Sequence, residues 1–385
     1  MKIVQNIERL EYLLKLYNLS KDDFLLRISE GLKQPLSEAD IFISNIEEKH
    51  LLRIDKIFKK GIHYYVDTNS PNTSQDVSIF FRKKDLSSDL NLSAKLLVNK
   101  FEELKISLST MNKLSDIQLQ RTLKSYSVSD SPESVANEIR TIVQPTFHSN
   151  LKKYLQSLIE VLAQQNIYVF EYIETWNKKE PSNIDGFYLR PNVIVLKRQQ
   201  QSFRREIFTL VHELGHYLLN EEDIEQLNIS KMLSNNLSEV EQWCNNFAFF
   251  FLMGETLQEF NMLRSVTQIN NYYEDEIKDF TAKTHISSLA LYTRLLKQRK
   301  ITQNDYNSVK KKLDEEYQQR LAKSKETKEL EKLSGKESGG AIPKPILSPL
   351  FISTIQTAYY DGIIKEIDVC NTLNIPPTQL HKYIQ

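Results

Sequence analysis

This chain has few cysteines, few glycines and no net charge. Each of these features limits the classes of protein to which it can belong. Cys244 and Cys370 are the only cysteines in 385 residues, which argues against a disulfide scaffold and fits a reducing cytosol. The fifty basic residues equal the fifty acidic ones, so composition implies no global attraction to nucleic acid or membrane. Glycine is rare while leucine, lysine and glutamate are frequent, which favours a mostly helical protein.

Long apolar runs are missing as well. No segment is long and apolar enough to span a bilayer. The first residues, Met1–Arg9, are charged and amphipathic, unlike a signal peptide. We therefore expect a cytoplasmic protein that does not contact a membrane, and its length allows two or three domains.

Two histidines stand four residues apart in the segment His212-Glu213-Leu-Gly-His216. Residues at this spacing share one face of a helix, so both imidazoles can bind one metal ion. Glu213 lies one position around the helix, where a carboxylate can act as general base on water without binding the metal. The spacing predicts the His-Glu-x-x-His site of a zinc-dependent hydrolase with one Zn²⁺ per chain and Glu213 as the catalytic residue.

A third zinc ligand is expected on a second helix, residues 239–253. Glu241 lies at the margin of its apolar arc, whereas Glu239 lies in the polar sector. We therefore predict Glu241 as the ligand and Glu239 as a surface or supporting group. Cys244, one turn after Glu241, is an alternative ligand, although a small core residue is the favoured interpretation.

The two helices together resemble the ImmA/IrrE metallopeptidases, which are often fused to an XRE-like helix-turn-helix. The resemblance rests on Phe208-Thr-Leu-Val-His-Glu-Leu-Gly-His216, on Glu241-x-x-Cys-Asn-x-Phe-Ala248 ending in Leu252-Met253, and on their spacing. It implies a zincin-like core in which His212, His216 and Glu241 bind zinc and Glu213 is the base. It also implies a protein substrate, commonly a partner transcriptional regulator. Cys244 and Gly254 depart from the family, which usually has Ala and Pro there.

A small β-sheet is expected before the first histidine. Residues 183–189 and 192–196 form a predicted hairpin around the turn Arg190-Pro191-Asn192, and residues 167–173 form a further strand. An exposed edge of this sheet could hold an extended substrate peptide, or could be an ordinary capped edge strand. His285 could stabilise an oxyanion, although a polar residue at a helix end is the favoured interpretation.

The amino-terminal region carries an amphipathic pattern from Leu10 to Leu32 and a second helical run from Ile41 to Phe58. Its end resembles the helix-turn-helix module of fused family members. Residues 1–66 hold eleven Lys or Arg against ten Asp or Glu, without the basic surplus usual for DNA binding. DNA contact and a protein-docking or structural module both remain open.

These patterns predict a mainly α fold with a small β-sheet (α+β), whose metallopeptidase core lies between helical modules. The predicted function is zinc-dependent cleavage of a regulatory protein. One alternative is a DNA-binding regulator with a structural zinc site, and another is a partner-binding protein that does not cleave. The predicted segments are 1–66 (helix-turn-helix-like), 67–78 (linker), 79–146 (helical), 147–300 (zinc metallopeptidase), 301–345 (charged helix and flexible linker) and 346–385 (helical).

Overall fold

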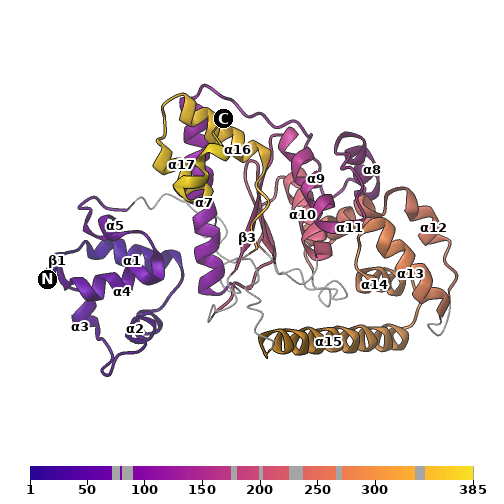
Figure 1. The fold of residues 1–385 in the computed structure, drawn as a ribbon, viewed down its shortest axis with the longest axis horizontal. Helices are drawn as coiled ribbons and strands as arrows, with labels where there is room; N and C mark the ends of the chain where they lie inside the picture. Colours follow the sequence, from indigo (N-terminus) through magenta and orange to yellow (C-terminus); the bar gives the residue numbers. More distant parts are fainter. Residues whose placement is uncertain are drawn as a thin grey trace. The chain divides into compact units, whose positions relative to one another are not determined.

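The computed structural model of the chain describes residues 1–71, 79, 90–174, 180–198, 203–224, 237–265, 271–333 and 343–384. The fold is mostly helical with two small sheets, which confirms the predicted class (Figure 1). The chain divides into two compact units. The first comprises Met1–Ile106 and Lys178–Asn183, and the second comprises Ser107–Asn177 and Ile184–Gln385.

The amino-terminal unit is built from short helices around buried apolar side chains. The predicted pattern from Leu10 to Leu32 forms two helices rather than one, because Asn18 has a φ of 47° after the first helix and Ser20 caps the second. Leu10, Phe24 and Ile54 are buried in its core. The helices are α1 (Ile7–Leu16), α2 (Lys21–Ser29), α3 (Glu38–Ile41), α4 (Glu48–Phe58) and α5 (Ile62–Val66).

The second predicted run, from Ile41 to Phe58, is interrupted. Its regular helix begins only at Glu48, the first residue of α4. The residues just before it, Asn45–Glu47, form strand β2, which pairs antiparallel with β1 (Lys2–Val4). The helix after α2 is therefore the single turn α3, and the helix-turn-helix stays a prediction.

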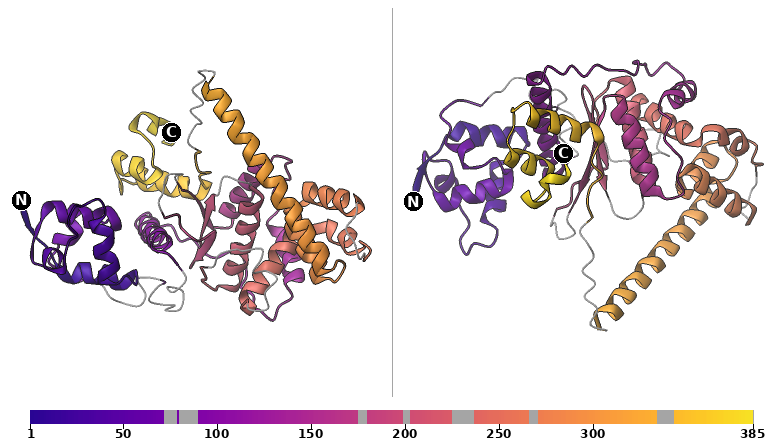
Figure 2. Two further views of the ribbon diagram at one scale, coloured as in Figure 1. Left: turned by 90° about the horizontal axis from the view of Figure 1, so that it is seen from below. Right: turned by 45° about the horizontal axis from the view of Figure 1, so that its top comes forward.

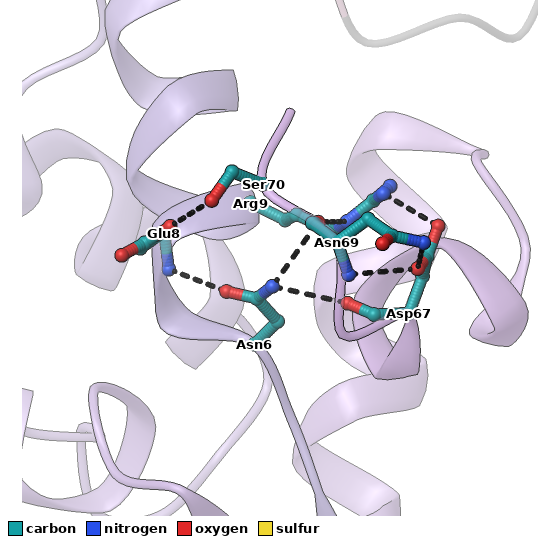
Figure 3. Close-up of polar contacts among 6 residues, drawn as sticks. All are labelled: Asn6, Glu8, Arg9, Asp67, Asn69 and Ser70. Atoms are coloured by element: carbon teal, nitrogen blue, oxygen red, sulfur yellow. Dashed lines mark hydrogen bonds and ion pairs between the residues drawn. The ribbon is translucent and has the colours of Figure 1, made fainter. Parts of the chain in front are cut away.

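A cluster of polar contacts ties residues 67–70, which follow α5, to the first helix of this unit (Figure 3). Asn6 caps α1 with its Oδ1 and donates through Nδ2 to the carbonyl oxygens of Asp67, at 3.0 Å, and Asn69, at 3.4 Å. Arg9 forms an ion pair with Asp67 and donates to the Asn69 carbonyl oxygen at 2.8 Å. These contacts hold the start of the predicted linker, whose residues 72–78 lie outside the described residues.

The second unit is organised around a three-stranded sheet. The predicted hairpin is confirmed: β4 (Gly186–Leu189) pairs antiparallel with β5 (Val193–Arg198), with Phe187 opposite Val195. The further predicted strand, β3 (Tyr168–Ile173), lies parallel to β5 on its other side. The strand order is therefore β3-β5-β4.

Helix α10 (Phe203–Leu219) lies along one face of this sheet, against β4 and β5, as Figures 1 and 2 show. Thirteen of its 17 residues are buried, and α11 (Glu239–Met253) packs against it as well. α8 (Pro132–Ile142) packs against α11, and α9 (Leu151–Gln164) packs against α10 and β3. α10 is thus enclosed on several sides, which makes it a rigid support for a site.

Further helices complete the chain. α7 (Leu92–Leu114) runs across the boundary between the two units. In the carboxy-terminal segment, Leu347 forms an antiparallel bridge with Phe170 of β3, and Thr354 shares a 2.7 Å hydrogen bond with Tyr168. No helix in the described ranges is both long and apolar enough to cross a bilayer. The remaining helices are η3 (Gly254–Thr256), α12 (Leu257–Asn261), α13 (Asn271–Thr284), α14 (Ser288–Lys297), α15 (Gln303–Leu333), α16 (Pro349–Tyr360), α17 (Glu366–Leu373) and η4 (Pro377–Lys382).

Candidate active site

A glycine allows α10 and α11 to approach closely at the site. A Cβ atom built on Gly215 would lie 3.1 Å from the Cys244 sulfur and 3.2 Å from the Cys244 Cα. Backbone cannot move aside as a flexible side chain can, so any larger residue at position 215 would push the helices apart. The glycine therefore sets the distance between the helix that carries His212 and His216 and the helix that carries Glu241.

These three side chains converge, with their metal-binding atoms all within 4.8 Å of one another. The Nε2 atoms of the two histidines are 3.1 Å apart. Oε2 of Glu241 lies 3.3 Å from Nε2 of His212, and Oε1 lies 2.8 Å from Nε2 of His216. Each residue is at most 2% exposed, so the cluster lies inside the protein rather than on a solvated helix face.

The donor set fits a zinc ion. In a tetrahedral site with zinc–ligand bonds of about 2.1 Å, neighbouring ligand atoms are about 3.4 Å apart, close to the distances between these atoms. The group of His212, His216 and Glu241 supplies three ligands, whereas structural zinc sites usually close the shell with a fourth Cys or His. A three-ligand set leaves a coordination position for water or substrate.

Glu241 and Glu239 take different positions, as the helix periodicity predicted. Glu241 is buried and its backbone N–H donates to the Ser238 side chain at 3.2 Å, whereas Glu239 is exposed. Burial opposes ionisation of Glu241, but His212 and His216 outweigh it and hold the pKa of Glu241 far below its ordinary value. The carboxylate is therefore ionised, as a metal ligand must be.

Glu213 follows His212 on α10 and is packed against β4. It is 4% exposed, and a Cβ on Gly186 of β4 would lie 3.2 Å from its Oε1 and 2.6 Å from Thr209 Cγ2. Burial raises the pKa of Glu213 to about 8, with a further contribution from Glu241 and opposition from His216. Gly186 was missed by sequence analysis, although a glycine inside a predicted strand is a signal of close approach.

Cys244 and His285 lie outside the three-ligand group. Cys244 is fully buried between α11 and α10. His285 is 1% exposed, with its ring stacked 4.9 Å from Phe147 and tilted 4.6 Å from Tyr154. His285 has a φ of 61° just after α13, so it occupies a helix end, as the favoured interpretation held.

The second departure from the family pattern, Gly254, also has a structural cause. Its φ of 49° disfavours a side chain. The guanidinium of Arg140 would lie 2.5 Å from a Cβ at this position, and it donates to the carbonyl oxygen of Phe251. Arg140 thereby satisfies a carbonyl group in the last turn of α11.

The two outer strands of the sheet, β3 and β4, differ in their neighbours among the described residues. Leu347 bridges to β3 on the side away from β5. Among the described strands, β4 pairs with β5 alone. All four residues of β4 are buried, and its Gly186 lies against Glu213.

A comparison with known families agrees with this geometry. The sequence model of a peptidase family, the IrrE N-terminal-like domain, matches residues 163–295. That segment contains the three-stranded sheet, α10, α11 and the His212, His216 and Glu241 group. No curated protein and no solved structure matches the chain. The chain therefore carries a metallopeptidase domain of this family, zincin-like and flanked by helical regions, which confirms the predicted enzyme class.

Proposed function

We propose that this domain is a zinc-dependent endopeptidase that cleaves a partner regulatory protein, such as a transcriptional repressor. In this proposal His212, His216 and Glu241 hold Zn²⁺, and Glu213 is the general base. The strongest support for the proposal is the convergence of three buried metal-binding side chains next to a further buried carboxylate, that of Glu213. Buried ionisable groups with strongly shifted pKa values are typical of catalytic sites.

The proposed roles follow from the position of each side chain. A zinc ion held by the three ligands supplies a Lewis acid that polarises the scissile carbonyl and makes water more acidic. Glu213 takes the proton from the attacking water oxygen and passes it to the leaving amine nitrogen. Its pKa of about 8 in the metal-free protein favours proton uptake, and a cation bound nearby would lower this pKa.

The outer edge of β4 is the proposed platform for an extended substrate. A peptide laid along this edge pairs its backbone with the strand, which gives affinity without demanding one sequence. Gly186 of this strand lies against Glu213, so a peptide paired with β4 would lie close to the base. A regulator with an exposed, unstructured segment is the substrate expected from this arrangement, in agreement with the family resemblance.

The amino-terminal unit is proposed to select the partner or to contact DNA. The two roles make different predictions for a Glu213→Gln variant. A DNA-binding regulator with a structural zinc site keeps its effect on transcription in this variant, whereas a peptidase loses it. A non-cleaving partner protein forms a stable complex in which the partner stays intact with zinc present.

The first experiment is elemental analysis of protein purified without added zinc. We expect about one zinc per chain in the wild type, loss of zinc in Glu241→Gln and retention in the matched control Glu239→Gln. Absence of zinc from the wild type, even after zinc is supplied, would rule out the proposed ligand set.

The second experiment identifies the substrate by labelling new protein amino termini in cells. Cells expressing the wild type are compared with cells expressing Glu213→Gln. New termini confined to the wild type, and mapping to a regulatory protein, support the proposal. Identical sets of termini in both strains under every inducing condition tried would contradict cleavage.

A further inference from the structure

The two ring nitrogens of His216 have different surroundings. Nε2 faces the metal-binding group, 2.8 Å from Oε1 of Glu241 and 3.1 Å from Nε2 of His212. Nδ1 on the other side of the ring is completely buried and forms no hydrogen bond. Histidines that bind metal nearly always donate this second N–H to a neighbour, which fixes the orientation of the ring and its tautomer.

The Cys244 thiol is a polar group on the facing helix that lies near the His216 imidazole. Cys244 lies three residues after Glu241, on the same face of α11, and is fully buried. Its sulfur approaches the backbone of α10 at Gly215, the residue immediately before His216, where it would be 3.1 Å from a Cβ. The thiol and the imidazole also interact electrostatically.

We infer that Cys244 is a positioning residue for the metal site: its sulfur is the partner of His216 Nδ1 and holds the ring with Nε2 toward the metal. This inference rests on the proposed role of His216 as a zinc ligand. Sulfur is a weak acceptor, and we expect it to take this hydrogen bond when Nε2 binds a cation. Alanine, usual for the family at this position, offers no acceptor, so this chain has an additional restraint on the ring.

A purely packing role makes a different prediction. Replacing a buried thiol by a methyl group leaves a small cavity and lowers the free energy of unfolding, with or without zinc. It does not by itself change the affinity of the folded protein for the metal. Zinc affinity and the spectrum of a bound metal therefore separate positioning from packing, and neither readout depends on peptidase activity.

The experiment measures the zinc dissociation constant of the full chain by competition with a chromogenic chelator. The variants are Cys244→Ala, Cys244→Ser and the matched control Cys370→Ala, which removes the other buried cysteine, in α17. We expect affinity about 10-fold weaker in Cys244→Ala, the low end of the range for loss of a ligand's supporting partner. Cys244→Ser, which keeps an acceptor, should recover most of it, and Cys370→Ala should match the wild type.

Cobalt substitution gives a second readout. The visible absorption of bound Co²⁺ depends on ligand geometry, so we expect it to change in Cys244→Ala and to stay close to wild type in Cys244→Ser. Wild-type zinc affinity and an unchanged cobalt spectrum in Cys244→Ala would overturn this inference alone. Equal weakening in the alanine and serine variants would also overturn it. A wild-type protein that binds no zinc would overturn the proposed function, and the inference with it.

Discussion

Two polar clusters in this protein are built on opposite principles. Around Asn6 and Asp67, partly exposed side chains donate to main-chain oxygens and cap a helix, so each group has a partner from the protein itself. Around His212, His216 and Glu241, titratable groups are buried at 2% exposure or less. Both histidines keep a buried Nδ1 atom without a hydrogen bond.

The contrast distinguishes a cluster that stabilises the fold from a cluster that is suited to a function. A cluster that satisfies its own polar groups stabilises the chain segment that it joins. A cluster that buries titratable groups side by side costs free energy, and a bound metal ion would offset that cost. The comparison therefore predicts that the first cluster responds to mutation by losing stability alone, whereas the second responds in metal binding, activity and pH dependence.

The largest effect is expected from Glu213→Gln. Loss of a general base lowers rates by about 10²- to 10⁴-fold, so cleavage of a substrate found by terminal labelling should fall by about 10³-fold. The zinc content should not change, because Glu213 lies outside the ligand group. Full activity in this variant would remove Glu213 from the mechanism.

Removal of zinc should have the second largest effect. A ligand present at 1,000 times its dissociation constant stabilises the folded state by about 4 kcal/mol. A chelator should therefore lower the free energy of unfolding of the second unit by about that amount, measured by urea denaturation. Wild type and Glu239→Gln should respond alike, and a Glu241→Gln variant should show little response to the chelator.

The pH dependence of the metal-free protein sharpens the comparison further. Glu213 has a native pKa of about 8 against an ordinary value of about 4.3, so between pH 5 and 7 the native state holds a proton that the unfolded state has released. Stability must then fall as pH rises, by up to about 3 kcal/mol over this window. His216, whose native pKa is also raised, acts in the same direction.

The Glu213→Gln variant isolates the glutamate contribution. Its unfolding free energy, measured by urea denaturation at pH 5, 6 and 7 with a chelator present, should decline less than that of the wild type. Parallel pH profiles for the two proteins would mean that Glu213 is ionised in the native state.

The smallest effect is expected in the first cluster. Asn6→Ala removes the cap of α1 and two hydrogen bonds to residues 67–69, which should cost about 1 kcal/mol. Urea denaturation followed through the amino-terminal unit measures this loss. Zinc content and peptidase activity should be unchanged, and a change in either would mean that the two clusters are coupled.

The sequence predicted those features that depend on local spacing. The i to i+4 pair His212 and His216, the burial of Glu241 with the exposure of Glu239, and the hairpin of β4 and β5 all follow from periodicities of a few residues. The approach of Gly186 to Glu213 was not predicted. Neither were the pairing of Lys2–Val4 with Asn45–Glu47 and the bridge from Leu347 to β3, because these contacts join residues far apart in the chain.

The contact between Gly215 and Cys244 also has an evolutionary consequence. With Cys244 in place, Gly215→Ala is expected to be harmful, because the new methyl group would meet both the sulfur and the backbone of α11. A smaller residue at position 244 relieves the clash with the sulfur and leaves that with the backbone, so compensation should be partial. The two positions are expected to show epistasis, in which the order of substitutions decides which sequences are accessible. Metal affinities of Gly215→Ala, Cys244→Ala and the double variant would measure that dependence.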